Sequence, residues 1–410
     1  MGGTGPAMTM STLATRCCIA GGGPAGMMLG FLLARAGIDV MVLEKHGDFL
    51  RDFRGDTVHP STMQVLQELG LLDGFLARPH SEVRTLAAKI GEELIQIADF
   101  SHLPTQAKFV AFMPQWDFLD FLADQAKRSP AFRLLMETEA TDLIHADDAV
   151  VGVTARGPDG ALDIRAELVV ACDGRHSTLR DAAGFQMIDR GAPMDVLWLR
   201  LSKHASDPAQ ILGHVDAGRI FIMLDRNDYW QCAFVIPKGA VDEVHARGLE
   251  AFRANIARLE PFLRDRVQEL ASWDDVKLLS VAVNRLDTWY RPGLLCIGDA
   301  AHAMSPVGGV GINLAIQDAV AAANVLVPRM TQRAAAVDDL RGVQRRREWP
   351  TLMTQRVQIG IQNRVISNVL RSTATPKPPL AIRMLGQFPT LRRLPARIIG
   401  MGFRPEHIRH

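Results

Sequence analysis

The segment from Thr15 to Lys45 restricts the fold more than any other part of the chain. A short apolar stretch leads into Gly21-Gly22-Gly23-Pro24-Ala25-Gly26, and a second apolar run follows the next turn and ends at Glu44. This order predicts strand, glycine loop, helix and strand, the opening unit of a dinucleotide-binding fold. Gly21 would permit the tight turn, Gly23 a close backbone approach to a pyrophosphate, and Gly26 the packing of helix on strand. The alternative is a glycine-rich turn without a ligand.

The ends of this unit add two further predictions. Pro24 and Ala25 begin the helix, whose N-terminal N–H groups and positive dipole end would face phosphates. Glu44 lies 18 residues after Gly26 and is followed by Lys45. That spacing is close to the roughly 20 residues expected for a carboxylate that holds a ribose hydroxyl.

Length and composition limit the remaining possibilities. At 410 residues the chain predicts two domains or one large interleaved α/β body. A net charge of +1 gives no electrostatic case for nucleic acid as a partner. The five cysteines form no CxxC pair and read as core residues in a reducing compartment, with no metal site. We therefore expect a cytoplasmic protein.

The two ends of the chain carry weaker signals. Residues 1–14 lack the basic and apolar regions of a signal peptide and predict a disordered lead-in. No uninterrupted apolar stretch approaches 18 residues, so no transmembrane segment is expected. Residues 331–410 read as helices with a basic last third. A helix in weak contact with a membrane surface and a packed segment with a solvated basic face are both possible, and the second is favoured.

Two further segments predict a ligand-facing edge. A polar loop after Glu44 contains Arg54, which is either a ligand contact or a solvated arginine. The apolar run 168–171 leads into Asp173-Gly174, and Arg180 follows in a short helix. The alternative for this second segment is a strand-to-helix turn capped by Ser177.

The region 293–319 contains a second glycine-rich loop. An apolar strand ends at Gly298-Asp299, and the loop then leads into an alanine-rich helix that begins near residues 311–313. The N-terminus of that helix is a second place for negative charge. His302 is a tempting general base, but it follows the strand-end turn, where a structural role is at least as reasonable. The loop residues of interest are Pro306, Gly308, Gly309, Gly311, Ile312 and Asn313.

Together, the segments GGGPAG, CDGRHSTLR and GDAAHAMSPVGGVGINLAIQDA resemble the three fingerprints of the class A FAD-dependent monooxygenases, the aromatic hydroxylases of the para-hydroxybenzoate hydroxylase type. The resemblance covers about residues 15–330. It implies a GR2-type FAD-binding Rossmann-like α/β domain interleaved with a β-sheet substrate domain and followed by C-terminal helices. The implied FAD-binding segments are 15–84, 112–184 and 286–330, and the substrate domain comprises 85–111 and 185–285.

The resemblance also implies roles for single residues. Gly21, Gly23 and Gly26 would contact the FAD pyrophosphate, Glu44 the ribose and Asp299 the ribityl chain. Arg54 and Gln115 resemble polar contacts on the flavin side, and Asp173 and Arg180 resemble a motif used for both FAD and NAD(P)H. Arg54, Pro306, Gly308 and Gly309 would border the reacting part of the flavin.

The implied reaction uses NADPH or NADH and O₂ to hydroxylate or epoxidise a small aromatic substrate through a flavin C4a-hydroperoxide. Hydroxybenzoate-type enzymes clamp a carboxylate with arginines on the second sheet, which residues 225–237 lack in that register. We therefore expect a larger apolar substrate, such as a polycyclic aromatic or polyketide-like phenol. The candidate substrate residues are Leu199, Phe221, Met223, Trp230 and Phe234.

Several alternatives remain open at this stage. A flavin-dependent halogenase would require a Trp-x-Trp-x-Ile-Pro motif, which the chain lacks. A prenyl-lipid reductase, a non-enzymatic flavin-binding sensor and a membrane-docked hydroxylase of a quinone precursor share the same scaffold. A monomer and a homodimer are equally compatible with the sequence.

Overall fold

A mainly parallel sheet of eight strands forms the centre of the protein. The computed structural model describes residues 11–50, 57–208 and 213–409. Strand β1 (Ser11–Ala20) lies between β11 (Gly160–Ala171) and β2 (Val40–Leu43), and β20 (Leu294–Cys296) and β8 (Phe132–Leu135) extend the parallel part. Antiparallel strands complete the sheet: β9 (Glu139–Ala146), β10 (Ala149–Gly157) and β19 (Tyr290–Arg291).

The topology of this sheet gathers the sequence motifs at one edge. Parallel strands end on the same side, so the segments that follow β1, β2, β11 and β20 come together there. These segments carry the first glycine loop, Glu44, Asp173 and Gly298 respectively. The strand order β20-β11-β1-β2 places the four loops side by side.

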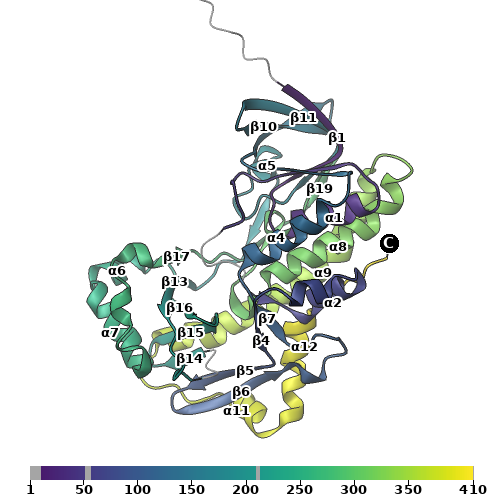
Figure 1. Ribbon diagram of the computed structural model, residues 1–410. Helices are drawn as coiled ribbons and strands as arrows, with labels where there is room; N and C mark the ends of the chain where they lie inside the picture. The colour runs from purple at the N-terminus through teal and green to yellow at the C-terminus, as the bar shows by residue number, and fades with distance from the viewer. Residues whose placement is uncertain (1–10, 51–56, 209–212, 410) are drawn as a thin grey trace, which may run out of the picture.

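Helices cover one face of this sheet. The helices α1 (Pro24–Arg35), α4 (Gln115–Ala126) and α8 (Gly311–Met330) lie together against it and share one apolar core (Figure 1). A second apolar cluster fills the opposite face, under the β9–β11 hairpins and α5 (Thr178–Ala182). The stretch Val307–Met330 is long and apolar enough to cross a membrane, with mean hydropathy 1.6. However, 78% of the 18-residue apolar window within it is buried inside the protein, so it packs as a core helix.

A second sheet of seven strands lies beside the first (Figure 1). Its order is β17-β13-β16-β15-β14-β5-β6, and only the β14–β5 pair is parallel. Helices α6 (Val241–Ala246) and α7 (Leu249–Leu259) belong to this part of the chain, and α7 packs on the sheet. The strands are β5 (Thr85–Ile90), β6 (Glu93–Asp99), β13 (Met194–Ser202), β14 (Gly213–Asp216), β15 (Arg219–Asp225), β16 (Tyr229–Pro237) and β17 (Lys277–Leu279).

Two sheets of three strands connect these parts. One contains β3 (Thr57–Val58), β7 (Val110–Phe112) and β4 (Ser81–Val83), and the other β12 (Met187–Asp189), β18 (Asn284–Leu286) and β21 (His302–Ala303). Helices α2 (Pro60–Glu68) and α3 (Leu72–Leu76) follow β3. Short 3₁₀ turns occupy Phe100–His102, Pro261–Leu263, Val267–Glu269, Trp273–Asp275, Gly298–Ala300 and Val307–Gly309.

The C-terminal part is helical, as its sequence indicates. The long helix α9 (Val337–Ile361) packs on α8 and continues through a π-turn (Gln362–Ile366) into α10 (Ser367–Arg371). Helix α11 (Leu380–Gln387), a 3₁₀ turn (Pro389–Arg392) and α12 (Arg393–Met401) then pack on β6.

The mixed α/β fold class is confirmed, and one expected boundary is wrong. Residues 11–14, expected in a disordered lead-in, belong to β1 and pair with residues 162–165 of β11. The sequence hides this because Ser11 to Thr15 is not an apolar run, and only the pairing with the long β11 extends the strand. The sequence Gly-Pro-Asp-Gly at 157–160 forms the turn that joins β10 to β11.

Candidate active site

The first glycine loop leaves open space at the N-terminus of α1. Gly21 has a φ of +103°, and a Cβ there would lie 2.3 Å from the carbonyl oxygen of Cys172. A Cβ on Gly26 would lie 2.0 Å from the Gly21 oxygen, so both positions require glycine. Gly23 is the N-cap of α1, and a Cβ there would meet nothing within 4 Å. The N–H groups after Pro24, including that of Ala25, therefore face a space that suits an anion.

Glu44 stands directly beside this loop. It follows β2, is 6% exposed, and its Oε2 accepts a hydrogen bond from Gly22 N–H at 3.1 Å. Its Oε1 accepts from His46 N–H at 3.0 Å. The carboxylate thus joins the end of β2 to the glycine loop and borders the same space. Lys45 instead points to the surface, where its Nζ lies 3.9 Å from Glu139 Oε1.

The side chains of the segment after β11 make contacts within the turn that leads into α5. Asp173 accepts hydrogen bonds from Ser177 Oγ at 2.5 Å and Leu179 N–H at 3.2 Å, and burial raises the pKa of its carboxyl. Arg180 is 5% exposed and pairs with Asp181 at 2.9 Å. Both side chains are therefore engaged in the α5 turn, as the structural alternative for this segment requires, while Gly174 leaves open space around its Cα.

Arg175 is the residue of this segment that reaches the Asp299 carboxylate. Its Nε lies 3.4 Å from Asp299 Oδ2, and Asp299 is 34% exposed. Arg175 comes directly after Asp173-Gly174 in the sequence. Sequence reasoning missed it because the ligand contacts of this motif were assigned to Asp173 and Arg180. Arg175 and Asp299 form an ion pair that bridges the ends of β11 and β20.

The second glycine loop is fixed from one side by Asn313 and Thr57. Asn313 Oδ1 accepts from His59 N–H and Thr62 Oγ1, both at 2.8 Å, and its Nδ2 donates to Thr57 O at 3.2 Å. Thr57 Oγ1 donates to Gly309 O at 2.9 Å, and a Cβ on Gly309 would lie 2.5 Å from that hydroxyl oxygen. The Asn313 side chain therefore holds the loop rather than extending toward a ligand.

Glutamines on the C-terminal helices hold the other side of the same loop. Gln358 Nε2 donates to Ser305 O and Val307 O, both at 2.9 Å, and its Oε1 accepts from Ser305 N–H at 3.2 Å. Gln362 in the π-turn donates to Ser305 Oγ at 2.7 Å. Both glutamines are at most 3% exposed. Sequence reasoning missed them, because a polar residue inside a helix carries no signal about its tertiary partner.

Between these contacts the loop itself remains partly open. Pro306 is half-buried and Gly308 is exposed, with φ of +80°. Gly311 begins α8, and a Cβ there would meet nothing within 4 Å, whereas the Ile312 side chain is buried in the core. The N-terminus of α8 thus offers backbone N–H groups, not side chains, to a ligand. Gln115 begins α4 and is half-buried.

A network of buried charged side chains holds the end of β20 in place through Gly298. His302 Nε2 lies 2.6 Å from Asp318 Oδ2, and Arg347 Nε lies 2.8 Å from Asp318 Oδ1. Asp318 also accepts from Gly298 N–H at 3.1 Å, and all three side chains are at most 1% exposed. Burial alone would raise the pKa of Asp318, but His302 and Arg347 outweigh it and hold that pKa below its ordinary value. His302 therefore has the structural role that was its alternative.

The expected substrate residues lie on the face of the seven-stranded sheet that packs against α7. All five are at most 8% exposed, and they pack in one core with Phe252 and Ile256 of α7: Leu199, Phe221, Met223, Trp230 and Phe234. A choice of residues by hydrophobicity alone picks the side chains of the sheet face that is buried in the core, and α7 buries that face here. The opposite face carries Trp198, Ile222 and Gln231, and the Trp198 Nε1 and Gln231 Nε2 atoms are buried without a hydrogen-bond partner.

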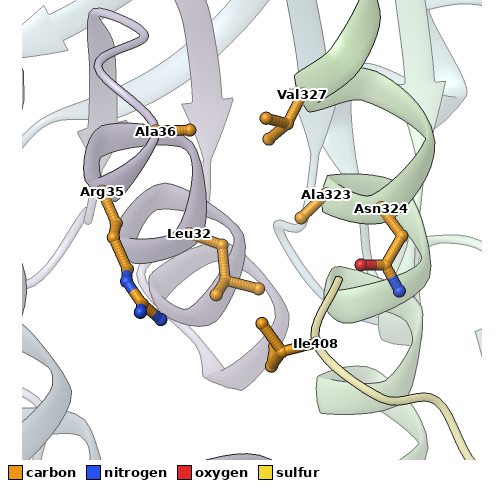
Figure 2. Close-up of a pocket in the computed structure, with 7 residues that line it drawn as sticks. All are labelled: Leu32, Arg35, Ala36, Ala323, Asn324, Val327 and Ile408. Atoms are coloured by element: carbon orange, nitrogen blue, oxygen red, sulfur yellow. The ribbon is translucent and has the colours of Figure 1, made fainter. Parts of the chain in front are cut away.

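Two other features complete the description of the site. Arg54 lies outside the described residues. A cavity of about 90 Å³ between α1 and α8 is lined by Leu32, Ala323 and Val327, with Ile408 from the C-terminal segment beside it (Figure 2). It lies at the end of α1 opposite to Gly23, so it is a packing gap and not part of the site. Within the described residues, no group of side chains suited to a metal ion comes together.

Two glycine loops, two helix N-termini and the bordering Glu44 and Asp299 meet at one sheet edge, which defines a dinucleotide-binding enzyme of the flavoprotein type. Comparisons with known proteins agree. The FAD binding domain family matches residues 14–356. The 6-methylpretetramide 4-monooxygenase of Streptomyces rimosus is 33% identical over 391 residues, which cover 94% of this chain and 92% of that protein.

Two more relatives extend the comparison. The 12-dehydrotetracycline 5-monooxygenase/anhydrotetracycline 6-monooxygenase of Streptomyces rimosus subsp. rimosus is 29% identical over 74% of this chain, which spans 60% of that protein. The crystal structure of p-nitrophenol 4-monooxygenase from Pseudomonas putida has a TM-score of 0.75 and 21% identity, covering 94% of this chain and 97% of that one. The chain belongs to the FAD-binding monooxygenase family. It is a flavoprotein monooxygenase with FAD as its cofactor.

Proposed function

We propose that this enzyme uses NADH or NADPH and O₂ to hydroxylate or epoxidise an apolar polycyclic aromatic or polyketide-like substrate. The observation that carries the proposal is the Pro306–Gly311 loop, which Asn313 and Gln358 hold from two sides while Gly308 and Gly311 stay open. The tetracycline-related names of two relatives support a polycyclic substrate.

The residues present fit FAD. The N–H groups beyond Gly23 would hold the pyrophosphate, Glu44 the ribose and Asp299 the ribityl chain. Bound FAD, once reduced by the nicotinamide, supplies the activation of O₂. The N–H groups at Gly311 and Ile312 would stabilise negative charge on the flavin ring, because the α8 dipole points its positive end there.

The chain's own residues would also choose the substrate and exclude water. We call the face of the seven-stranded sheet opposite α7 the inner face. It carries Trp198 and Ile222 between two apolar clusters, which suits an aromatic ring system. The unpartnered Nε1 of Trp198 and Nε2 of Gln231 are hydrogen-bond donors that a substrate oxygen would satisfy. A dry site matters because water would divert the activated oxygen.

Anaerobic stopped-flow reduction with NADH and NADPH, with and without a panel of polycyclic phenols, tests the proposal. We expect one class of phenol to accelerate flavin reduction and to be hydroxylated when O₂ is admitted. FAD that neither nicotinamide reduces under any of these conditions would refute it. Trp198→Phe should raise KM for that phenol, while Trp230→Phe, on the α7 side, should leave KM unchanged. The reverse pattern would place the substrate on the other face.

We also propose a reducing, cytoplasmic setting and a monomer or homodimer. All five cysteines are free, which supports the compartment. Sedimentation equilibrium of the FAD-loaded protein measures the oligomeric state, and a trimer or larger assembly would contradict this expectation.

A further inference from the structure

The helices α11 and α12 present an apolar face to solvent. Leu380, Met384 and Phe388 follow helical spacing along one side of α11, and the opposite side packs on β6, where Gly386 lies against Ile95. Helix α11 lies at the edge of the molecule drawn lowest in Figure 1, and the 3₁₀ turn that follows it contacts both α11 and α12. We call these residues the apolar face, with exposed fractions of 75% for Leu380, 40% for Met384, 52% for Phe388, 40% for Leu391 and 66% for Leu394.

The charged residues of the segment that carries the apolar face are all of one sign. Residues 349–405 contain nine lysines and arginines and no aspartate or glutamate, although the whole chain has a net charge of only +1. Four of these cations are exposed beside the apolar face: Lys377, Arg383, Arg393 and Arg397. Glu92, in the turn before β6, and Glu93, the first residue of β6, border the start of α11, since Gly91 contacts Thr375. The face itself carries only positive charge.

Exposed apolar side chains together with exposed cations favour one kind of binding partner for this face. In a symmetric dimer the same patch meets itself, which would place the arginines of two copies against each other. An acidic protein surface would match the cations but would leave five large apolar side chains to be covered. An anionic membrane surface satisfies both, because apolar side chains enter the acyl boundary while lysines and arginines meet the headgroups.

We propose that α11 and α12 form an interfacial docking surface for membranes that contain anionic lipid. The chain would lie on the membrane without crossing it, with β6 and the inner face of the seven-stranded sheet directly behind the contact. An enzyme placed in this way would meet apolar substrates that partition into lipid. This inference goes beyond the proposed function and does not depend on it.

Co-sedimentation of the full-length FAD-loaded protein with lipid vesicles tests the proposal. One set contains phosphatidylcholine alone, and the other phosphatidylcholine and phosphatidylglycerol in equal parts. We expect binding to the second set that weakens as salt increases. Arg393→Gln with Arg397→Gln should weaken partitioning about fivefold per cation, because each basic residue contributes about 1 kcal/mol near such a surface. Phe388→Ser with Leu394→Ser should abolish binding.

Matched variants elsewhere on the surface control for general effects. Leu278→Ser removes a leucine that is 47% exposed on β17, and Arg247→Gln removes an exposed cation directly after α6. Both should bind vesicles like the unaltered protein. Absence of vesicle binding at low salt would overturn the proposal, as would binding that the apolar-face variants leave intact. Concentration-dependent dimers that Phe388→Ser abolishes, without vesicle binding, would assign the face to a second copy instead.

Discussion

Replacement of Asp318 by asparagine tests how the buried network supports the site. Asp318 is 0% exposed and accepts from Gly298 N–H while pairing with His302 and Arg347. The asparagine amide would keep the volume but remove the charge. Among the described residues, Arg347 would then keep Glu406 as its carboxylate partner, whose Oε1 lies 3.6 Å from the arginine Nη1. Breaking a buried pair in this way costs about 3–5 kcal/mol. At about 2 cal/mol/K of unfolding entropy per residue, a chain of this length should lose about 4–6 °C in Tm.

The pH dependence of this contribution follows from the lowered pKa of Asp318. Because the folded-state pKa lies below the unfolded value of about 4, the stabilisation is complete above that pH and is lost as pH falls through the folded pKa. The full penalty of Asp318→Asn should therefore appear at pH 7. Thermal unfolding of the FAD-loaded protein followed by calorimetry measures it.

Two further variants make the result interpretable. Asp265→Asn removes a carboxylate that also pairs with an arginine, at 3.2 Å from Arg266, but is 64% exposed, and it should cost less than about 1 kcal/mol. Adding Arg347→Met to Asp318→Asn should recover part of the loss, because it removes the uncompensated charge. A penalty for Asp318→Asn no larger than that of Asp265→Asn would refute the reasoning.

Three other perturbations have defined outcomes. Gly21→Ala forces a Cβ against the Cys172 carbonyl at a φ of +103°, so the purified protein should lose at least about tenfold in FAD affinity by flavin fluorescence titration, and unchanged affinity would show that the loop can relax. Gln358→Leu removes three hydrogen bonds to the Pro306 loop and should slow flavin reduction by about tenfold or more, whereas the exposed Gln332→Leu should not; equal rates would exclude a positioning role. Burial lowers the pKa of His59 to about 4, so the neutral ring stabilises the fold above about pH 6.5, and this contribution of about 3 kcal/mol is lost as pH falls toward 4. Urea unfolding at several pH values should show that the free energy of unfolding depends less on pH in His59→Asn than in the unaltered protein. An unchanged pH dependence would contradict the assignment.

The sequence alone determined the fold class, the cofactor and the order of the three motifs. Gly21 and Gly26 act within a few residues of their own position, where a tight turn and a close helix–strand contact permit no Cβ. Apolar runs followed by glycine or aspartate likewise predict strand ends, and parallel pairing then brings those ends together. These features depend on residues that are close in sequence, so they can be predicted without the tertiary contacts.

Only the tertiary structure decided which face of the second sheet α7 covers and what holds the second glycine loop. Trp230 and Trp198 are equally plausible substrate residues by composition, but α7 covers one and leaves the other at the inner face. Gln358 and Thr57 contact the same loop from positions 301 residues apart in the chain, and neither has a local signal. Hydrogen bonds between distant residues depend on packing of whole elements, and no single stretch of sequence records that packing.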